Sequence, residues 1–424
     1  MRIYSSTEHS ISRSQISEEA LKVLSRLKQA GFQAYLVGGC VRDLLLGREP
    51  KDFDVVTDAR PEQIKSIFRN CRLIGRRFRL AHIYFGRKVI EVATFRGGDS
   101  NGDRVVENGR LLRDNVYGTL EEDVWRRDFS VNALYYNADD FSVVDYVGGM
   151  KDHENGILRL IGDPEQRYRE DPVRMLRLIR FSTKLGFTID PGSEHLIKEL
   201  SALLEEIPPA RLYDECLKLF LTGYALQTFE LLRKYHLFEK LFPSTEKCLA
   251  REQDGFPLTF LGKALENTDI RINQDKPVTA YFLLAAFLWE PVRTSIEDRM
   301  CNGENEFTAL QQASSAVIRQ QSKTTSLPRR VVLSMREIWS LQPRFKYRSG
   351  ERPLKLLEHP RFRAAFDFLV LRATTGGADV ALAEWWENFQ TLDEDERKKM
   401  LQGPRRSQRR RPRLRAVGKS PAPN

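Results

Sequence analysis

The chain contains few cysteines, and none of them lies in a pattern typical of a metal site or a disulfide framework. Only five occur in 424 residues, with no CxxC pair and no histidine at metal-ligand spacing. Neither a zinc site nor a disulfide-stapled secreted domain is therefore indicated. This cysteine usage favours a reducing, cytoplasmic setting. The five cysteines lie at positions 40, 71, 216, 248 and 301.

Long hydrophobic runs are also missing. The longest covers residues 281–289, which is too short to span a bilayer and predicts the buried core of a helix. The N-terminal stretch MRIYSSTEHSISRSQ lacks the apolar region of a signal peptide. We therefore expect no membrane insertion.

Acidic residues are absent from the last 24 positions, which carry seven arginines and one lysine. These eight cations supply most of the net charge of +10, so the rest of the chain is almost neutral. Such a polar, proline-rich segment predicts a disordered tail over residues 401–424, suited to a polyanion such as RNA. A solubilising tail is the alternative. The arginines expected to bind RNA are Arg405, Arg406, Arg409, Arg410, Arg411, Arg413 and Arg415.

The spacing of apolar residues, which make up 41% of the chain, changes along its length. Residues 17–30 have the periodicity of an amphipathic helix that ends at Gly31, and strand and helix patterns then mix to about residue 150. After Gly162, segments with helical spacing continue to about residue 395. The pattern predicts an α/β domain followed by a helical half, in a chain long enough for two to four domains.

A strand pattern at residues 34–37 leads directly into Gly38 and Gly39 and then into a short predicted helix that contains Arg42. Only glycine lets the backbone approach a phosphate closely, and a helix start offers unpaired N–H groups to an anion. This stretch is therefore a candidate triphosphate site. Paired glycines are also common in ordinary turns, so the motif alone is weak evidence.

Three carboxylates sharpen this prediction. Residues two apart on a strand project from the same face, so Asp52 and Asp54 are expected to point together while Phe53 turns into the core. Two such carboxylates can hold a pair of divalent cations. Residues 80–95 predict two strands joined at residues 86–88, and they place Glu91 on a strand that can lie beside the aspartates. A solvated loop or edge is the ordinary alternative for each residue alone.

A second cluster lies in the segment GDPEQRYREDPVRMLRLIRFSTKLG. Asp171 precedes Pro172 as an N-cap precedes the first helical residue, and Gly186 ends the predicted helix. Arg174, Arg177 and Arg180 recur every three residues and so share one face. A helix cap and a solvated basic face would explain these residues structurally. An acceptor and a donor one turn apart can also read the edge of a base, while nearby guanidiniums neutralise phosphates.

A third cluster occupies residues 119–132, TLEEDVWRRDFSVN. Thr119 and Glu122 form a capping box at a predicted helix start, which is a structural signal. If this helix persists, Asp128 and Asn132 share a face and can hold a ribose, while Arg127 approaches phosphates.

Together these clusters resemble the motifs of the class II nucleotidyltransferases, the family that contains bacterial tRNA CCA-adding enzymes and bacterial poly(A) polymerases. The matching stretches are LVGGCVRDLLLGREPKDFDV, EVATFR, RRDFSVNAL and REDPVRMLRLIRF. The resemblance implies an α/β nucleotidyltransferase head with a mixed sheet, followed by all-α neck and body domains and the basic tail. The implied parts are an N-terminal extension and helix (1–30), the catalytic head (31–155), a neck with a base-recognition helix (156–220), an RNA-binding body (221–400) and the tail (401–424).

The same resemblance implies that Asp52 and Asp54 bind two catalytic Mg²⁺ ions and that Glu91 completes the acidic site. One ion would activate the RNA 3′-hydroxyl for attack on the α-phosphate of ATP, and the other would stabilise the leaving pyrophosphate. The residues implied to bind the nucleotide are Gly38, Gly39 and Arg42 for the triphosphate, Arg127, Asp128 and Asn132 for ribose and phosphate, Glu170, Asp171 and Arg174 for the base, and Arg177 and Arg180 as neighbouring cations.

Within the family, LIGRRFRLAHI at residues 73–83 looks like the poly(A) polymerase version. CCA-adding enzymes usually carry a glycine-threonine pair where Arg79 and Leu80 stand here. Residues 352–373 and the arginine-rich tail also resemble the polymerases. His82 lies in the same block, but a single histidine near aromatic residues is more often a core residue than a ligand, so it is not assigned to the site.

The expected function is thus that of a template-independent ATP:RNA adenylyltransferase, which adds poly(A) to RNA 3′ ends and promotes RNA processing and decay. RNA is the expected partner, with RNA-decay proteins as further candidates. The alternative is a CCA-adding enzyme that uses CTP and ATP on tRNA. A third interpretation, an RNA-binding regulator with an inactive head, is disfavoured because Asp52, Asp54 and Glu91 are all present.

Overall fold

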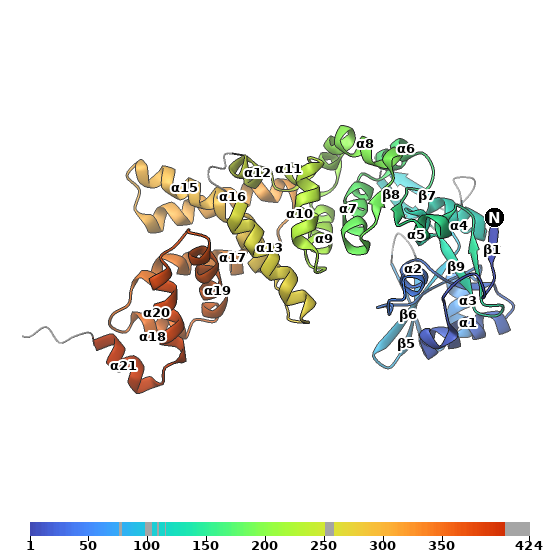
Figure 1. Ribbon diagram of the computed structural model, residues 1–424, viewed down its shortest axis with the longest axis horizontal. Helices are drawn as coiled ribbons and strands as arrows, with labels where there is room; N and C mark the ends of the chain where they lie inside the picture. Colours follow the sequence, from blue (N-terminus) through green and yellow to red (C-terminus); the bar gives the residue numbers. More distant parts are fainter. Residues whose placement is uncertain (76–78, 98–103, 108–109, 115, 251–257, 403–424) are drawn as a thin grey trace, which may run out of the picture. The chain divides into compact units, whose positions relative to one another are not determined.

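The computed structural model describes residues 1–75, 79–97, 104–107, 110–114, 116–250 and 258–402. A mixed α/β region comes first and a helical region follows, as the sequence predicts (Figure 1). The chain divides into two compact units: Met1–Lys247 with Leu265–Val278 and Gln320–Leu327, and Cys248–Ala264 with Thr279–Arg319 and Pro328–Asn424. These units do not separate a head from a neck, so the five-part division stays a prediction.

An eight-stranded mixed sheet forms the centre of the α/β region. Only the β3–β6 pair is parallel, and every other neighbouring pair is antiparallel. The strand order is β1 (Arg2–Tyr4), β10 (Ser142–Asp145), β9 (Leu134–Asn137), β2 (Ala34–Val37), β3 (Asp54–Thr57), β6 (Lys88–Thr94), β5 (Leu80–Phe85) and β4 (Cys71–Ile74). Two separate pairs are β7 (Arg104–Glu107) with β8 (Arg110–Asp114) and β11 (Ile157–Leu158) with β12 (Thr188–Ile189).

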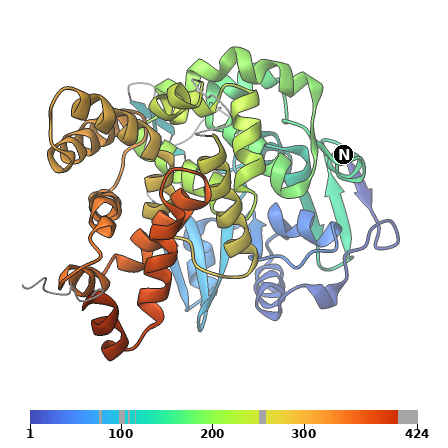
Figure 2. The same cartoon turned by 60° about the vertical axis from the view of Figure 1, so that its left-hand side comes forward.

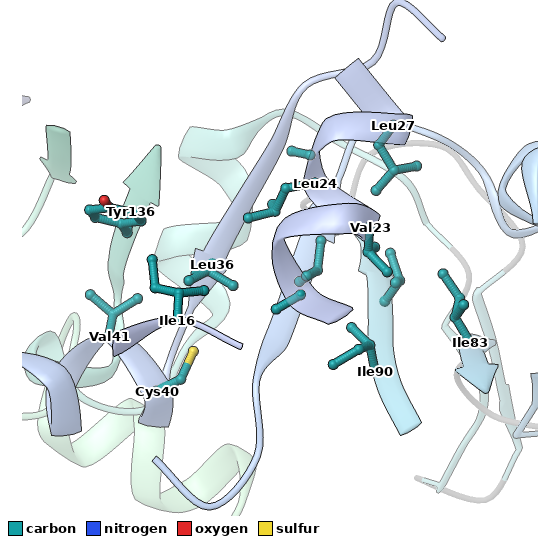
Figure 3. Close-up of a cluster of buried hydrophobic side chains, with 14 of the residues drawn as sticks. Ile16, Val23, Leu24, Leu27, Leu36, Cys40, Val41, Ile83, Ile90 and Tyr136 are labelled. Carbon is teal, nitrogen blue, oxygen red and sulfur yellow. The ribbon is translucent and has the colours of Figure 1, made fainter. Parts of the chain in front are cut away.

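Both faces of this sheet are buried at the neighbouring strands β2 and β9. Side chains alternate between faces along each strand, and Leu36 and Tyr136 belong to one hydrophobic cluster while Val37 and Tyr135 belong to another. Figure 3 shows the first cluster, in which the α1 side chains pack with those of β5 and β6. The helices of this region are α1 (Glu18–Gln29), α2 (Gly39–Leu45), α3 (Pro61–Ile67), α4 (Leu120–Arg126) and α5 (Gly149–Glu154), with 3₁₀ turns η1 (Arg13–Gln15) and η2 (Ser130–Asn132).

The helix predicted over residues 17–30 is confirmed as α1. The Ser17 hydroxyl caps its start by accepting a hydrogen bond from the Ala20 N–H at 3.2 Å. Gly31 follows its end with φ +87°, a conformation that favours glycine.

Apart from the short pair β11 and β12, the remainder of the described chain is helical, as expected (Figure 2). The apolar run at residues 281–289 is buried in and just after α14, as predicted. These helices are α6 (Pro164–Glu170), α7 (Val173–Leu185), α8 (Pro191–Leu200), η3 (Ser201–Glu206), α9 (Pro209–Phe220), α10 (Ala225–Lys234), α11 (Phe238–Leu241), α12 (Pro243–Leu249), α13 (Leu258–Asn273), α14 (Ala280–Phe287), α15 (Trp289–Cys301), α16 (Glu306–Thr324), α17 (Arg329–Leu341), η4 (Gln342–Lys346), α18 (Arg352–Leu357), α19 (Phe362–Thr374), α20 (Val380–Thr391) and α21 (Glu394–Gln402).

The predicted tail lies almost wholly outside the described residues. Its first two residues, Leu401 and Gln402, belong to α21, so the disordered segment predicted from residue 401 begins too early. The predicted RNA-binding arginines at 405–415 fall beyond the last described residue. Across the described ranges, no helix is both long and apolar enough to cross a membrane.

Candidate active site

The paired glycines form the turn between β2 and α2. Gly38 has φ +78°, which other residues rarely adopt, and α2 begins at Gly39. A Cβ atom at Gly38 would lie 3.8 Å from Arg127 Nη1, and one at Gly39 would lie 3.6 Å from Arg42 Nη2. Two guanidinium groups therefore lie beside this turn, in which Gly38 is buried and Gly39 is half-buried. Arg127, predicted to bind ribose and phosphate, thus lies beside the glycines predicted to bind the triphosphate.

The predicted pairing of the acidic strands is confirmed. β3 and β6 are parallel neighbours, and Asp54 lies directly opposite Glu91. The predicted strand position of Asp52 is wrong, because β3 begins only at Asp54 and Asp52 lies in the bend before it. Phe53 is half-buried against the cluster of Figure 3, as expected.

The electrostatics of Asp54 show that the three carboxylates lie near one another. Desolvation by the surrounding protein and the neighbouring Glu91 carboxylate raise its pKa from 3.8 to about 6. Asp52 adds to this increase, and Arg127 opposes it. Asp54 itself remains solvent-exposed, so solvent and ions can reach it. The site is thus a group of like charges beside one guanidinium.

His82 contacts this acidic group, although its sequence context did not assign it to the site. The register of the β5–β6 hairpin sets His82 opposite Glu91, and the His82 Nε2 atom lies 3.3 Å from Glu91 Oε2. The signal was available, because a two-residue turn at Gly86 fixes which residues face each other.

Arg127 is held by a cluster that the sequence did not reveal. Its Nη2 and Nε groups donate to Asp123 Oδ2 at 2.8 and 3.1 Å, and Nε also donates to the Tyr135 hydroxyl at 2.7 Å. Tyr135 donates in turn to the same Asp123 oxygen at 2.7 Å. Burial alone would lower the pKa of Arg127, but these two partners raise it above its usual value, so the group stays charged. The guanidinium is thereby fixed beside Gly38.

A hydrogen-bonded chain connects α7 to α2. The Arg177 Nε group donates to Asp128 Oδ2 at 2.9 Å, Asn132 Nδ2 donates to Asp128 Oδ1 at 3.2 Å, and Arg42 Nη1 donates to Asn132 Oδ1 at 2.6 Å. Burial would raise the pKa of Asp128, but Arg177 holds it below the usual value. The helix predicted to carry Asp128 and Asn132 ends at Arg126, so the prediction of a shared helical face is wrong. The two residues nevertheless meet, because η2 folds Asn132 back.

Arg42 is only 3% exposed, and Asp43 and Asn132 occupy its guanidinium. Its predicted contact with the triphosphate stays a prediction. In the structure, the Arg42 guanidinium instead holds the Asn132 side chain by a hydrogen bond.

The predicted base-reading residues lie where α6 meets α7. Arg174 Nη1 donates to Glu170 Oε2 at 2.8 Å and to the Arg167 carbonyl at 2.7 Å, whereas Asp171 Oδ2 accepts from Arg211 Nη2 at 2.6 Å. Asp171 and Arg174 therefore have separate partners. No sequence pattern pointed to Arg211, which arrives from α9 forty residues later.

The predicted cap of α7 is displaced by one residue. Pro172 occupies the N-cap position and Asp171 ends α6, although Asp171 Oδ1 still accepts from the Val173 N–H at 3.3 Å. Gly186 ends the helix with φ +76°, as predicted.

Three arginines surround the ring of Phe181. The guanidinium carbons of Arg180, Arg42 and Arg177 lie 4.8, 5.3 and 5.7 Å from its centroid. Burial and the nearby Arg177 lower the pKa of Arg180. Two arginines of the predicted basic face of α7, Arg177 and Arg180, thus pack on the Phe181 ring, which Arg42 also contacts.

The described residues include no group of three or more His, Cys, Asp or Glu side chains that holds a metal ion by itself. The acidic cluster still suits Mg²⁺, which takes oxygen ligands and is usually bound by one or two carboxylates together with substrate phosphates. The raised pKa of Asp54 is consistent with this fit, because a bound cation would offset both the desolvation and the repulsion by Glu91 and Asp52 that raise it.

Three family profiles match the chain. They are described as "Poly A polymerase head domain" over residues 34–159, "Probable RNA and SrmB-binding site of polymerase A" over residues 186–249 and "Polymerase A arginine-rich C-terminus" over residues 302–418. The CCA-adding enzyme of Bacillus stearothermophilus, solved in complex with CTP, shares the fold with a TM-score of 0.58 and 27% identity over 88% of this chain and 80% of that one. Fold and site together define a nucleotidyltransferase.

Relatives that match over nearly the whole chain show which kind of nucleotidyltransferase it is. Poly(A) polymerase I of Escherichia coli O6:H1 is 49% identical over 96% of this chain and 91% of that protein, and its counterpart in Haemophilus influenzae is 48% identical over 95% and 91%. The CCA-adding enzyme of Bacillus subtilis is 37% identical over only 53% and 55%. The chain belongs to the poly(A) polymerase I family. Membership of this family confirms the expected function, which is addition of poly(A) to RNA 3′ ends.

The raised pKa of Asp54, caused by desolvation and by the Glu91 carboxylate, predicts a measurable effect on stability. Its folded pKa lies above the ordinary value, so the folded state binds more protons and the contribution of this group is lost as the pH rises through about 6. With a chelator present, Asp54→Asn is therefore expected to stabilise the protein at pH 7.5 by about 1 kcal/mol, because solvent screens an exposed carboxylate. Thermal unfolding at pH 7.5 and pH 5 measures this, and the gain must shrink at pH 5. An equal change at both pH values would contradict it.

Proposed function

We propose that the RNA 3′-hydroxyl attacks the α-phosphate of ATP at the carboxylates of Asp52, Asp54 and Glu91, and that pyrophosphate leaves. The observation that supports this most is the direct pairing of Asp54 with Glu91 beside the glycine turn and Arg127. A carboxylate pair next to a glycine turn and a guanidinium suits phosphoryl transfer, because its catalysis consists mainly of positioning and charge stabilisation.

Asp52 and Asp54 would hold Mg²⁺, with Glu91 completing the site. The bound metal supplies activation of the attacking hydroxyl and stabilisation of the charge on the transferring and leaving phosphates. His82 orients the Glu91 carboxylate through the contact between its Nε2 atom and Oε2. This reaction needs no covalent protein intermediate. In agreement, no serine or cysteine is assigned as a nucleophile.

The triphosphate would lie along the turn at Gly38 and Gly39, with Arg127 as its principal cation. Asp123 and Tyr135 hold that guanidinium in place before ATP arrives, so the conformational cost of ordering it is already met. Asp128 and Asn132 would bind the ribose. Their bonds to Arg177 and Arg42 couple the ribose position to α7 and α2.

Without a template, the protein must choose the base itself. Asp171 and Arg174, with Glu170, are proposed to read the edge of adenine, and Arg211 and Glu170 then act as the partners that hold them in its absence. Arg177 and Arg180 would neutralise nearby phosphates. CCA-adding enzymes use a similar pair for both CTP and ATP, so ATP preference depends on the surroundings of these side chains.

RNA would bind the helical regions and the tail arginines at 405–415. Proteins of RNA decay are proposed partners, in line with the family description of residues 186–249 as a probable RNA and SrmB-binding site. The cytoplasmic setting expected from cysteine usage stays a prediction.

The test is to incubate purified protein with Mg²⁺, each NTP separately, and either an oligo(A) primer or tRNA that lacks its CCA end. Long products with ATP alone on oligo(A) are expected. Addition of C to the tRNA with CTP alone, and a stop after three additions once ATP is also supplied, would instead identify a CCA-adding enzyme. No addition under any condition would point to an RNA-binding protein with an inactive head.

Deleting residues 404–424 is expected to weaken RNA binding and to flatten its salt dependence. Each phosphate of single-stranded RNA that the shortened protein no longer neutralises removes roughly 0.7 from the slope of log K against log salt. The control replaces the seven tail arginines with lysine, which keeps the charge. Filter binding across a salt series measures both variants, and saturating RNA should largely restore turnover. A truncated protein with unchanged affinity and slope would make the tail a solubility or partner-binding segment.

A further inference from the structure

Tyr347 is an exposed aromatic residue on the second compact unit, directly after η4. Half of its surface is open to solvent, which is unusual for a tyrosine in a chain whose other aromatic residues mostly pack in the core. The guanidinium carbon of Arg352, at the start of α18, lies 4.7 Å from the ring centroid. One face of the ring is therefore covered by a cation.

The backbone on both sides of this pair is anchored in a hydrophobic core. Phe345 is fully buried two residues before Tyr347, and its carbonyl accepts a hydrogen bond from the Trp386 indole at 2.9 Å. Leu356 is buried four residues after Arg352 and belongs to the same cluster. The Tyr347–Arg352 pair is thus held between fixed points, so it is ordered before any ligand binds.

The surrounding charge is strongly basic. Among residues 344–355, five cations stand against one acid, Glu351. Lys346 pairs with Glu306 at 2.7 Å and Lys355 pairs with Glu351 at 2.9 Å. Within the described part of the chain, the guanidinium groups of the remaining three cations form no ion pair or hydrogen bond. These are Arg344, Arg348 and Arg352.

The same core also anchors the helix that leads to the arginine-rich tail. Met400 and Leu401 of α21 pack against the cluster that contains Phe345 and Leu356. The last described helix before the tail therefore packs on the core that supports the Tyr347–Arg352 pair.

We propose that Tyr347 and Arg352 form a stacking platform for a base of single-stranded RNA, with Arg344 and Arg348 contacting its phosphates. This rests on the proposed function only in that RNA is the substrate. Exposed aromatic rings combined with basic side chains bind single strands without sequence readout, since every base has a stacking face.

The test measures binding of fluorescein-labelled oligo(A) to the full chain at several salt concentrations, without ATP or Mg²⁺. Tyr347→Ala is expected to weaken binding roughly 5- to 100-fold and to leave the salt slope unchanged, because no charge is removed. Arg348→Ala, which removes a proposed phosphate contact, should weaken binding and also reduce the slope by about 0.7. Tyr347→Phe keeps the ring and should bind like the unaltered protein.

Two controls separate stacking from structural damage. Leu333→Ala removes an equally exposed apolar side chain of the same unit and should have no effect on binding. An abasic oligonucleotide has no base to stack, so Tyr347→Ala and the unaltered protein should bind it equally. Unchanged oligo(A) binding by Tyr347→Ala, or an equal loss on the abasic strand, would overturn the platform. AMP addition, assayed separately at saturating primer, reports on the proposed function and is independent of either result.

Discussion

Asp52→Asn or Asp54→Asn is expected to reduce the rate of AMP addition by several orders of magnitude while the protein stays folded. Each change removes an anionic oxygen from the site proposed to hold Mg²⁺ beside the α-phosphate, and the missing charge stabilisation acts on the transition state itself. Neither side chain supports the fold: Asp54 is exposed at the start of β3, and Asp52 lies in the bend before it. Single-turnover kinetics with saturating ATP and oligo(A) measure the chemical step.

Asp58→Asn is the matched control for this loss. Asp58 follows β3 at its other end and accepts a hydrogen bond from the Gln33 N–H at 2.8 Å, which an asparagine oxygen can also accept. This variant should retain activity. Glu91→Gln should also be severe, since Glu91 lies opposite Asp54. Near-normal activity in purified Asp52→Asn or Asp54→Asn would rule out the metal assignment.

Arg174→Ala is expected to lower the preference for ATP over CTP and GTP by roughly 10- to 100-fold and to slow addition. One bidentate base contact contributes about 1–3 kcal/mol of discrimination, by analogy with base reading in DNA. In the absence of nucleotide Arg174 is held by Glu170 and the Arg167 carbonyl, so it is already positioned at the junction of α6 and α7. Relative incorporation of the four NTPs, each with its own kcat/KM, gives the selectivity.

A purely structural role predicts a different outcome for Arg174→Ala. The helix junction would loosen, the melting temperature would fall, and the ratios among the four NTPs would stay the same. Arg169→Ala is the control, because Arg169 makes a similar pair with Glu165 four residues away at 2.8 Å but carries no proposed contact with the base. Its selectivity should match that of the unaltered protein.

The features predictable from the sequence are those that depend on local spacing. The change from α/β to helical segments and helix α1 follow from periodicity and turn residues, and the structure agrees. The β3–β6 partnership is expected instead from the three carboxylates, and it is also observed. The positions of Asp52 and Asp128 could not be predicted in this way. Strand β3 begins only after Asp52, and helix α4 ends before Asp128. Element ends depend on a few hydrogen bonds, which a periodic pattern does not specify.

Some partners of the candidate site residues are brought in by tertiary packing and leave no local signal. Arg211 reaches Asp171 from α9, forty residues later, and Tyr135 reaches Arg127 from β9, eight residues later. Their identity depends on how helices and strands pack, since any arginine or tyrosine on those elements has the same sequence appearance. His82 is the exception, because the hairpin register alone places it opposite Glu91.

In the proposed mechanism, AMP is transferred at the Asp52–Asp54–Glu91 site with a metal ion at the α-phosphate. This mechanism can be tested with ATP in which sulfur replaces one non-bridging oxygen of the α-phosphate. Mg²⁺ prefers oxygen ligands, whereas softer metals such as Mn²⁺ accept sulfur more readily. Single-turnover addition to oligo(A) is measured for each diastereomer with Mg²⁺ and with Mn²⁺. We expect that one diastereomer reacts much more slowly with Mg²⁺ and regains its rate with Mn²⁺. Equal rates for both diastereomers with Mg²⁺, and no gain with Mn²⁺, would contradict a metal ion at the α-phosphate.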